Sequence, residues 1–170
     1  ALEPSSPCSS PLHSATRMVR RGLAPTALRM RAASSTTATP EVLSLAFGLA
    51  SPPSLEPRYN IAPMQLVPIV RVNAHGEREI VHVRWGLVPR WAKDPSIGAR
   101  MINARGETVA DKPAFRTAYR RHRVLLPASG FYEWMARAGG KQPMHIAMKD
   151  GAPFAFAGLA ERWLPPEGEP

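Results

Sequence analysis

The sequence predicts an α+β fold in which short strands outnumber short helices. The 170 residues include 19 Pro and 12 Gly, a content that favours turns and short elements over long helices. From residue 66 onward, runs rich in β-branched and aromatic residues recur between turn residues, whereas only two segments show helical spacing of apolar residues. The length corresponds to one domain of ordinary size.

The first 39 residues differ from the remainder in composition. They contain no aromatic residue and a single acid, Glu3, and they are rich in Ser, Thr, Ala and Arg. Such a segment buries too little apolar area to offset the entropy of ordering it. We therefore expect residues 1–39 to be a disordered or non-native basic segment and residues 40–170 to form the domain. Two alternatives are an organellar transit peptide over residues 1–35 and a basic arm that touches phosphates.

The first predicted helix is Glu41–Phe47. Thr39 can cap it, Pro40 suits its first turn, and Gly48 can end it. We expect its buried face to carry Val42, Leu45 and Ala46.

The second predicted helix lies within residues 111–121. Asp111 can cap it and Pro113 fits its first turn. We expect one face to carry Phe115, Ala118 and Tyr119, and the other to carry Arg116 and Arg120.

The remaining ordered segments are predicted to be strands. Leu66–Val72 and Arg78–Trp85 flank Asn73–Glu77, which contains Gly76, so this region predicts a hairpin. Four further strands are expected at Arg123–Pro127, Phe131–Trp134, Pro143–Lys149 and Phe154–Ala160. The stretch up to Pro170 offers no closing element, which suggests a domain truncated at its C-terminus.

The charge points to a polyanionic partner. The chain has 22 Lys and Arg against 13 Asp and Glu, a net charge of +9. Residues 84–123 contain ten basic and three acidic side chains, an excess that indicates a basic face on the domain. Nucleic acid is the first candidate partner and an acidic membrane surface the second, while a merely basic surface is the alternative.

Several other classes are excluded or disfavoured. No apolar stretch reaches the roughly 18 residues of a membrane-spanning helix, so a spanning segment is excluded, and nucleic acid rather than a membrane is the partner that we predict. The single cysteine, Cys8, excludes an intramolecular disulfide, and no cluster of cysteines suggests structural zinc. We predict neither a metal nor a cofactor.

Glu133 is the first candidate for chemistry. It lies among Phe131, Tyr132 and Trp134, and strand alternation places it on the face opposite Tyr132 and Trp134. A carboxyl group that is partly desolvated by aromatic rings suits general acid and base catalysis. The alternative is an exposed glutamate on a solvated face.

Two further groups fit nucleic acid. Asn103 and Arg105 are two residues apart, so an extended segment directs both towards the same side, where they could hold a phosphate or a sugar edge. The alternative is a surface loop in which Arg105 pairs with Glu107. Trp85 and Trp91 could stack on bases of a single strand, or they could be core residues.

Four motifs in this order resemble the SOS response-associated peptidase (SRAP) family. They are Arg58-Tyr59-Asn60-Ile61-Ala62-Pro63, Trp85-Gly86-Leu87-Val88-Pro89, Asn103-Ala104-Arg105-Gly106-Glu107-Thr108 and Gly130-Phe131-Tyr132-Glu133-Trp134. Lys141-Gln142-Pro143 adds to the resemblance. It implies a compact, mainly β fold with a few short helices, acting as a monomer in the bacterial cytoplasm near the nucleoid.

The resemblance also implies a function in DNA repair and the SOS response. Family members bind abasic sites in single-stranded DNA and form a covalent protein–DNA linkage. They first remove their own initiator Met, which is a protease-like hydrolase step. The N-terminal Cys that this exposes then condenses through its thiol and its amine with the sugar aldehyde to give a thiazolidine, which is a lyase-like chemistry. By this resemblance the catalytic positions are Asn103 and Glu133. The DNA-binding positions are Arg58, Asn60, Trp85, Pro89, Trp91, Arg105 and Lys141.

The chain departs from the family at two places. It lacks the Met-Cys-Gly-Arg start, and Cys8 is an internal residue whose nitrogen is an amide, so we expect no thiazolidine cross-link. It also lacks the later His-Asp-Arg-Met-Pro-like motif that supplies a catalytic histidine. Whether this chain is an enzyme is therefore left open. The alternative interpretation is a non-catalytic single-stranded DNA-binding module or a non-functional fragment.

Overall fold

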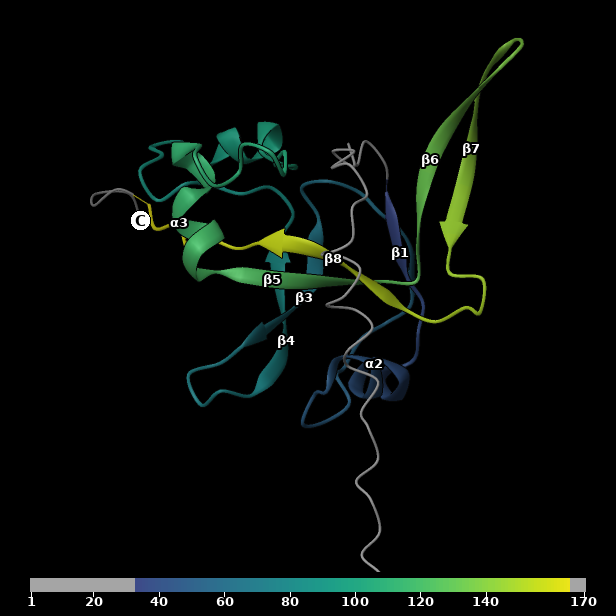
Figure 1. The fold of residues 1–170 in the computed structure, drawn as a ribbon, viewed down its shortest axis with the longest axis horizontal. Helices are drawn as coiled ribbons and strands as arrows, with labels where there is room; N and C mark the ends of the chain where they lie inside the picture. Colours follow the sequence, from purple (N-terminus) through teal and green to yellow (C-terminus); the bar gives the residue numbers. More distant parts are fainter. Residues whose placement is uncertain (1–32, 166–170) are drawn as a thin grey trace, which may run out of the picture.

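The computed structural model describes residues 33–165, whose strands form two four-stranded antiparallel sheets. One sheet has the strand order β2-β1-β6-β7 and the other β4-β3-β5-β8 (Figure 1). The strands are β1 (Ser34–Thr36), β2 (Arg58–Ile61), β3 (Leu66–Val72), β4 (Arg78–Arg84), β5 (Arg123–Ala128), β6 (Gly130–Arg137), β7 (Gly140–Ala147) and β8 (Phe154–Leu159). The predicted mainly β α+β class is confirmed.

Strand β1 lies within the segment that composition assigned to a disordered region. It pairs with β2 on one side and β6 on the other, with Ser34 opposite both Ile61 and Phe131. Polar contacts hold it: the hydroxyl of Thr36 donates to the carbonyl of Pro127 at 3.1 Å. The ordered fold therefore begins before residue 40, because a Ser/Thr strand can be fixed by its neighbours' backbone groups. Residues 1–32 lie outside the described part of the chain.

The first helix has the predicted ends but a different buried face. In α2 (Pro40–Phe47), Thr39 caps the N-terminus and Gly48 ends the helix in the left-handed conformation, with a φ of 62°. Leu43 and Phe47 are buried and pack with Val70 of β3, whereas Leu45 is 88% exposed. The predicted face of Val42, Leu45 and Ala46 was wrong, because the large side chains at i and i+4 are the ones that reach the sheet.

The second helix, α3 (Pro113–Arg121), buries Phe115 and Ala118 as predicted. Its Tyr119 is partly exposed. The cap differs, because Lys112 occupies the N-cap position and makes no side-chain hydrogen bond to the helix. Asp111 is therefore not the cap.

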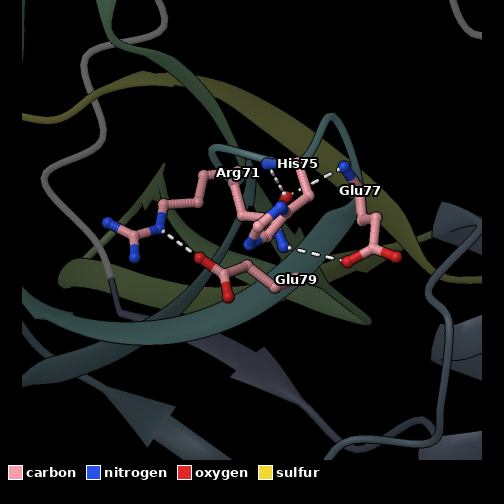
Figure 2. Close-up of polar contacts among 5 residues, drawn as sticks. Arg71, His75, Glu77 and Glu79 are labelled. Atoms are coloured by element: carbon pink, nitrogen blue, oxygen red, sulfur yellow. Dashed lines mark hydrogen bonds and ion pairs between the residues drawn. The ribbon is translucent and has the colours of Figure 1, made fainter.

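The predicted hairpin is confirmed as β3 and β4, in which the pairing runs from Leu66 opposite Arg84 to Val72 opposite Arg78. Its turn is closed by Asn73, whose side-chain oxygen accepts hydrogen bonds from the backbone N–H groups of His75 and Glu77 at 2.9 and 3.0 Å. Figure 2 shows this turn together with the neighbouring pair of Arg71 and Glu79.

The chain passes from one sheet to the other between β5 and β6. The two sheets meet through Phe131 of β6, which contacts Phe154 and Phe156 of β8 edge to face, with ring centroids 6.3 and 5.6 Å apart. The hydroxyl of Ser129, between the strands, accepts hydrogen bonds from the backbone N–H groups of Thr37 and Ala38. This joint fixes the start of β6 and so positions Glu133.

Within residues 33–165, no helix has the length and apolar character that crossing a membrane requires.

Candidate nucleic-acid interface

Glu133 lies on β6, opposite Met144 of β7. Strand alternation places it on the same face as Phe131, which packs against β8, and on the opposite face from Tyr132, whose ring packs on His145. The side chain is partly buried and makes no hydrogen bond or ion pair with any described residue. A carboxyl group in this setting can take a proton from a bound molecule as the carboxylate and then return it as the acid.

Asn103 follows the 3-10 helix η1 (Pro95–Arg100) and is partly buried. The indole N–H of Trp85 donates to the carbonyl of Ile102 at 2.9 Å, and the backbone N–H of Leu87 donates to the carbonyl of Met101 at 3.1 Å. These two bonds tie the backbone just before Asn103 to the end of β4. Trp85 therefore positions the asparagine.

The start of this loop is fixed by Asp94. Its carboxylate accepts hydrogen bonds from the hydroxyl and from the backbone N–H of Ser96, the latter at 2.8 Å. These donors hold the pKa of Asp94 below its ordinary value, with the hydroxyl contributing more.

Four predicted DNA contacts are exposed. The side chains of Arg105 and Lys141 have no partner among the described residues, and Trp91 is 62% exposed on the loop after β4. Asn60 is also exposed, on β2. These side chains are accessible to a ligand.

Two predicted DNA contacts are core residues instead. Trp85 is 7% exposed and packs with Ile61 and Ile69, and Pro89 is fully buried. Neither presents a face to a base, because hydrophobic packing around the second sheet covers them. Sequence spacing alone cannot separate a buried tryptophan from an exposed one in the same loop, and here only Trp91 is exposed.

Arg58 is engaged within the fold. Its guanidinium donates to the backbone carbonyl of Leu66 and to the side-chain oxygen of Gln65, the latter at 2.7 Å. These bonds tie β2 to the start of β3. Arg58 also lines a cavity of about 240 Å³ together with Thr36, Ser54, Leu55, Glu56, Ile61, Pro68 and His82.

The predicted residues therefore come from both sheets. Glu133 and Lys141 lie on the β6–β7 hairpin of the first sheet, whereas Asn103, Arg105 and Trp91 belong to the segment that follows β4 of the second. Among the predicted residues, only Arg58 lines the 240 Å³ cavity.

Sequence reasoning missed a polar cluster at the base of β6. The hydroxyl of Ser35 lies 3.2 Å from Nε2 of His145, and the hydroxyl of Tyr132 donates to the carbonyl of Tyr59 at 3.2 Å. Gly130 leaves room for the histidine, since a Cβ there would lie 2.2 Å from Nε2 of His145. The glycine of the Gly-Phe-Tyr-Glu-Trp motif was the available signal.

Sequence reasoning also missed Arg137, which ends β6 and whose side chain has no partner among the described residues. The sequence has no acidic residue between Glu133 and Asp150, which was the available signal that this arginine is not paired locally.

Comparisons with known proteins agree with the motifs. The sequence model of the family described as SOS response associated peptidase (SRAP) matches residues 29–170. The abasic site processing protein YoaM of Bacillus subtilis is 46% identical over 116 residues, which cover 68% of this chain and 51% of that protein. The abasic site processing protein HMCES of Gallus gallus is 30% identical over 141 residues, covering 66% and 42%. The chain spans about half the length of these relatives.

Solved structures share the fold. A crystal structure of a protein from Bordetella bronchiseptica superimposes with a TM-score of 0.68 and 28% identity, covering 81% of this chain and 66% of that one. A protein from Bacteroides thetaiotaomicron gives a TM-score of 0.64 at 26% identity, covering 78% and 60%.

Proposed function

Because the chain belongs to the SOS response associated peptidase family, we propose that it recognises abasic sites in single-stranded DNA. The relatives are named for abasic site processing. The observation that carries the proposal is Glu133, a partly buried carboxylate without a partner among the described residues. The net charge of +9 favours the approach of DNA.

Glu133 acts on the sugar of the lesion. An abasic deoxyribose is mainly a cyclic hemiacetal, which opens when its ring oxygen gains a proton and its C1′ hydroxyl loses one. The carboxylate of Glu133 takes the proton from the C1′ hydroxyl as the C1′–O4′ bond breaks, and water donates a proton to the ring oxygen. The product is the open aldehyde, and the proton held by Glu133 returns to the hydroxide that is left.

The other site residues predicted from the motifs hold the strand. The amide of Asn103 orients the open sugar, and Arg105 and Lys141 contact phosphates on either side of it. Trp91 stacks on a flanking base, and Asn60 and Arg58 support the sugar–phosphate backbone of the DNA. The buried Trp85 acts indirectly, by fixing the segment before Asn103.

The test compares two single strands of the same sequence, one undamaged and one with a single abasic site. Fluorescence anisotropy at fixed salt should show tighter binding of the abasic strand by the wild type. Glu133→Gln should keep the affinity and slow the appearance of aldehyde, trapped with an alkoxyamine probe, by about 100-fold. Arg105→Ala should weaken binding of both strands.

Two results would contradict the proposal. Equal affinity for the two strands would favour a non-catalytic DNA-binding module. No binding together with no cooperative unfolding transition would favour a non-functional fragment.

A further inference from the structure

The helix α3 carries a row of cations on its exposed side. Phe115 and Ala118 are buried where the helix contacts β5 and β8, and this packing fixes its rotation. Lys112, Arg116 and Arg120 are all exposed and are spaced four residues apart, so their side chains follow one side of the helix. At 1.5 Å per residue, this row is about 12 Å long.

The row works against the stability of the helix. Lys112 with Arg116, and Arg116 with Arg120, are like-charge pairs four residues apart, which destabilise a helix. Lys112 also occupies the N-cap position, where the helix dipole disfavours a cation, and it makes no capping hydrogen bond with its side chain. The sequence has no acidic residue between Asp111 and Glu133 that would compensate. Residues that break the local rules of stability are expected at functional sites.

The fold does not neutralise the row. The side chains of Lys112, Arg116 and Arg120 make no hydrogen bond or ion pair with any described residue. The buried carboxylate of Glu161, near the C-terminal end of the helix, lies 3.6 Å from Nδ1 of His122 rather than beside an arginine. Unpaired cations in line match the regular negative charges of a polynucleotide backbone.

The row continues the path of cations that begins at Arg105. The backbone N–H of Thr108 donates to the carbonyl of Arg105 at 3.2 Å, and the backbone N–H of Lys112 donates to the carbonyl of Thr108 at 3.1 Å. Each such turn brings its two ends within about 7 Å of one another, so Arg105 and Lys112 lie within about 14 Å. The buried side chain of Val109 anchors these turns. A strand whose phosphate is held by Arg105 is therefore close to the start of the row.

The row is remote from the carboxylate at the lesion. Helix α3 precedes β5 and Glu133 follows it, and the six residues of β5 at about 3.4 Å each span about 20 Å. Figure 1 shows α3 and the β6–β7 hairpin at opposite ends of β5. A stacked strand advances about 3.4 Å per nucleotide, so this distance corresponds to about six nucleotides. A strand held at Glu133 therefore reaches α3 only through undamaged nucleotides on one side of the lesion.

We propose that Lys112, Arg116 and Arg120 form a second contact surface for single-stranded DNA, which binds the undamaged backbone on one side of the lesion after the strand has passed Arg105. This inference rests on the proposed recognition of abasic single strands and deepens it. It gives the protein a footprint that extends to one side of the lesion. Phosphate contacts carry no sequence information, so the gain in affinity is the same for any flanking sequence.

The experiment uses the full chain and three abasic single strands. The short strand has about two nucleotides on each side of the lesion, and the other two add about ten undamaged nucleotides on the 5′ or on the 3′ side. Affinities are measured by fluorescence anisotropy over a series of salt concentrations. The test variant is R116Q/R120Q. The matched control is R71Q/K149Q, which makes the same charge change at exposed residues outside the row.

We expect one of the two extended strands to bind about tenfold more tightly than the short strand. R116Q/R120Q should lose most of this gain, and the slope of log affinity against log salt on the extended strand should fall by about 1.4. Its affinity for the short strand should stay within about twofold of the wild type. Its unfolding midpoint should be no lower than that of the wild type, because the like-charge pairs are gone. The control should keep the gain from the extension.

Three results would overturn the role of the row alone. The first is no gain, or an equal gain, from the two extensions, and the second is a gain that R116Q/R120Q retains. The third is loss of the gain when polyglutamate is added at the same concentration of charge, which would assign the row to an acidic protein segment. Equal affinity of the wild type for short abasic and short undamaged strands would instead reject the proposed function, so the two failures are distinguishable.

Discussion

The two antiparallel hairpins of this protein use their charged residues in opposite ways. In β3–β4, Arg71 donates to Glu79 at 2.8 Å, and Asn73 bonds to Glu77 across the turn (Figure 2). In β6–β7, Arg137 and Lys141 have no described partner. Near its turn the first hairpin pairs its charged side chains internally, whereas near its own turn the second leaves its cations exposed. The difference teaches that the location of unpaired charge, rather than the total charge, indicates where a polyanion binds.

The hairpins also differ in what they bury. Val67, Ile69 and Val70 of β3 are buried on both faces of the second sheet, while every residue of the β6–β7 arm, residues 134–143, is exposed. Changes in β3 should therefore affect folding, and changes in the arm should affect binding.

The largest expected effect is on stability. Ile69→Ala should lower the free energy of unfolding by about 2–5 kcal/mol, because it leaves a cavity in the core. Met135→Ala in the arm should change it by less than about 0.5 kcal/mol. Urea denaturation measures both, and an equal loss in the two variants would show that the arm is packed against something in solution.

The next effect concerns the residue that links β4 to Asn103. Trp85→Phe removes the hydrogen bond to Ile102 and should cost about 1 kcal/mol of stability, since a partly buried carbonyl loses its donor. The preference for abasic over undamaged strands should fall, while affinity for undamaged DNA stays the same. Loss of affinity for both strands would mean instead that Trp85 contacts DNA directly.

A smaller effect separates a paired arginine from an unpaired one. Arg71→Ala should cost at most about 1 kcal/mol, as expected for an exposed ion pair, and should not alter DNA binding. Arg137→Ala should leave the unfolding midpoint unchanged and reduce the salt slope on abasic single-stranded DNA by about 0.7. A change in salt slope with Arg71→Ala would remove the distinction between the hairpins.

The smallest effect concerns pH. The pKa of Asp94 is lowered in the folded protein, so its contribution to stability is present above its ordinary pKa and is lost as the pH falls through the lowered value. Hydrogen exchange over residues 95–102 should be unchanged between pH 7 and 5, once corrected for intrinsic rates, and faster in acid. Asp94→Ala should show the fast exchange already at pH 7.

Short-range sequence patterns correctly predicted the helix caps and the turn that depend on nearby residues. The caps at Thr39 and Gly48 and the turn at Asn73 depend on residues a few positions apart, and the structure has them as expected. The buried face of α2 was mispredicted because only the sheet decides that Leu43 and Phe47 face inward. Strand β1 was missed because its Ser and Thr residues are held by partners more than 90 residues away.

The candidate site shows the same limit. The motifs identified Asn103 and Glu133, and strand alternation placed Glu133 opposite Tyr132 and Trp134. They could not separate Trp85 from Trp91, because burial depends on the packing of the second sheet. Arg137 was missed since its significance depends on the projection of the arm.

The most direct test of the account is hydrogen exchange of the full chain with and without an abasic single strand. We predict slower exchange in residues 101–105 and 132–143 on binding, and no change in residues 71–79. Protection of the β3–β4 turn, or unchanged exchange in both the arm and the segment around Asn103, would contradict the claim that DNA binds where the charges are unpaired.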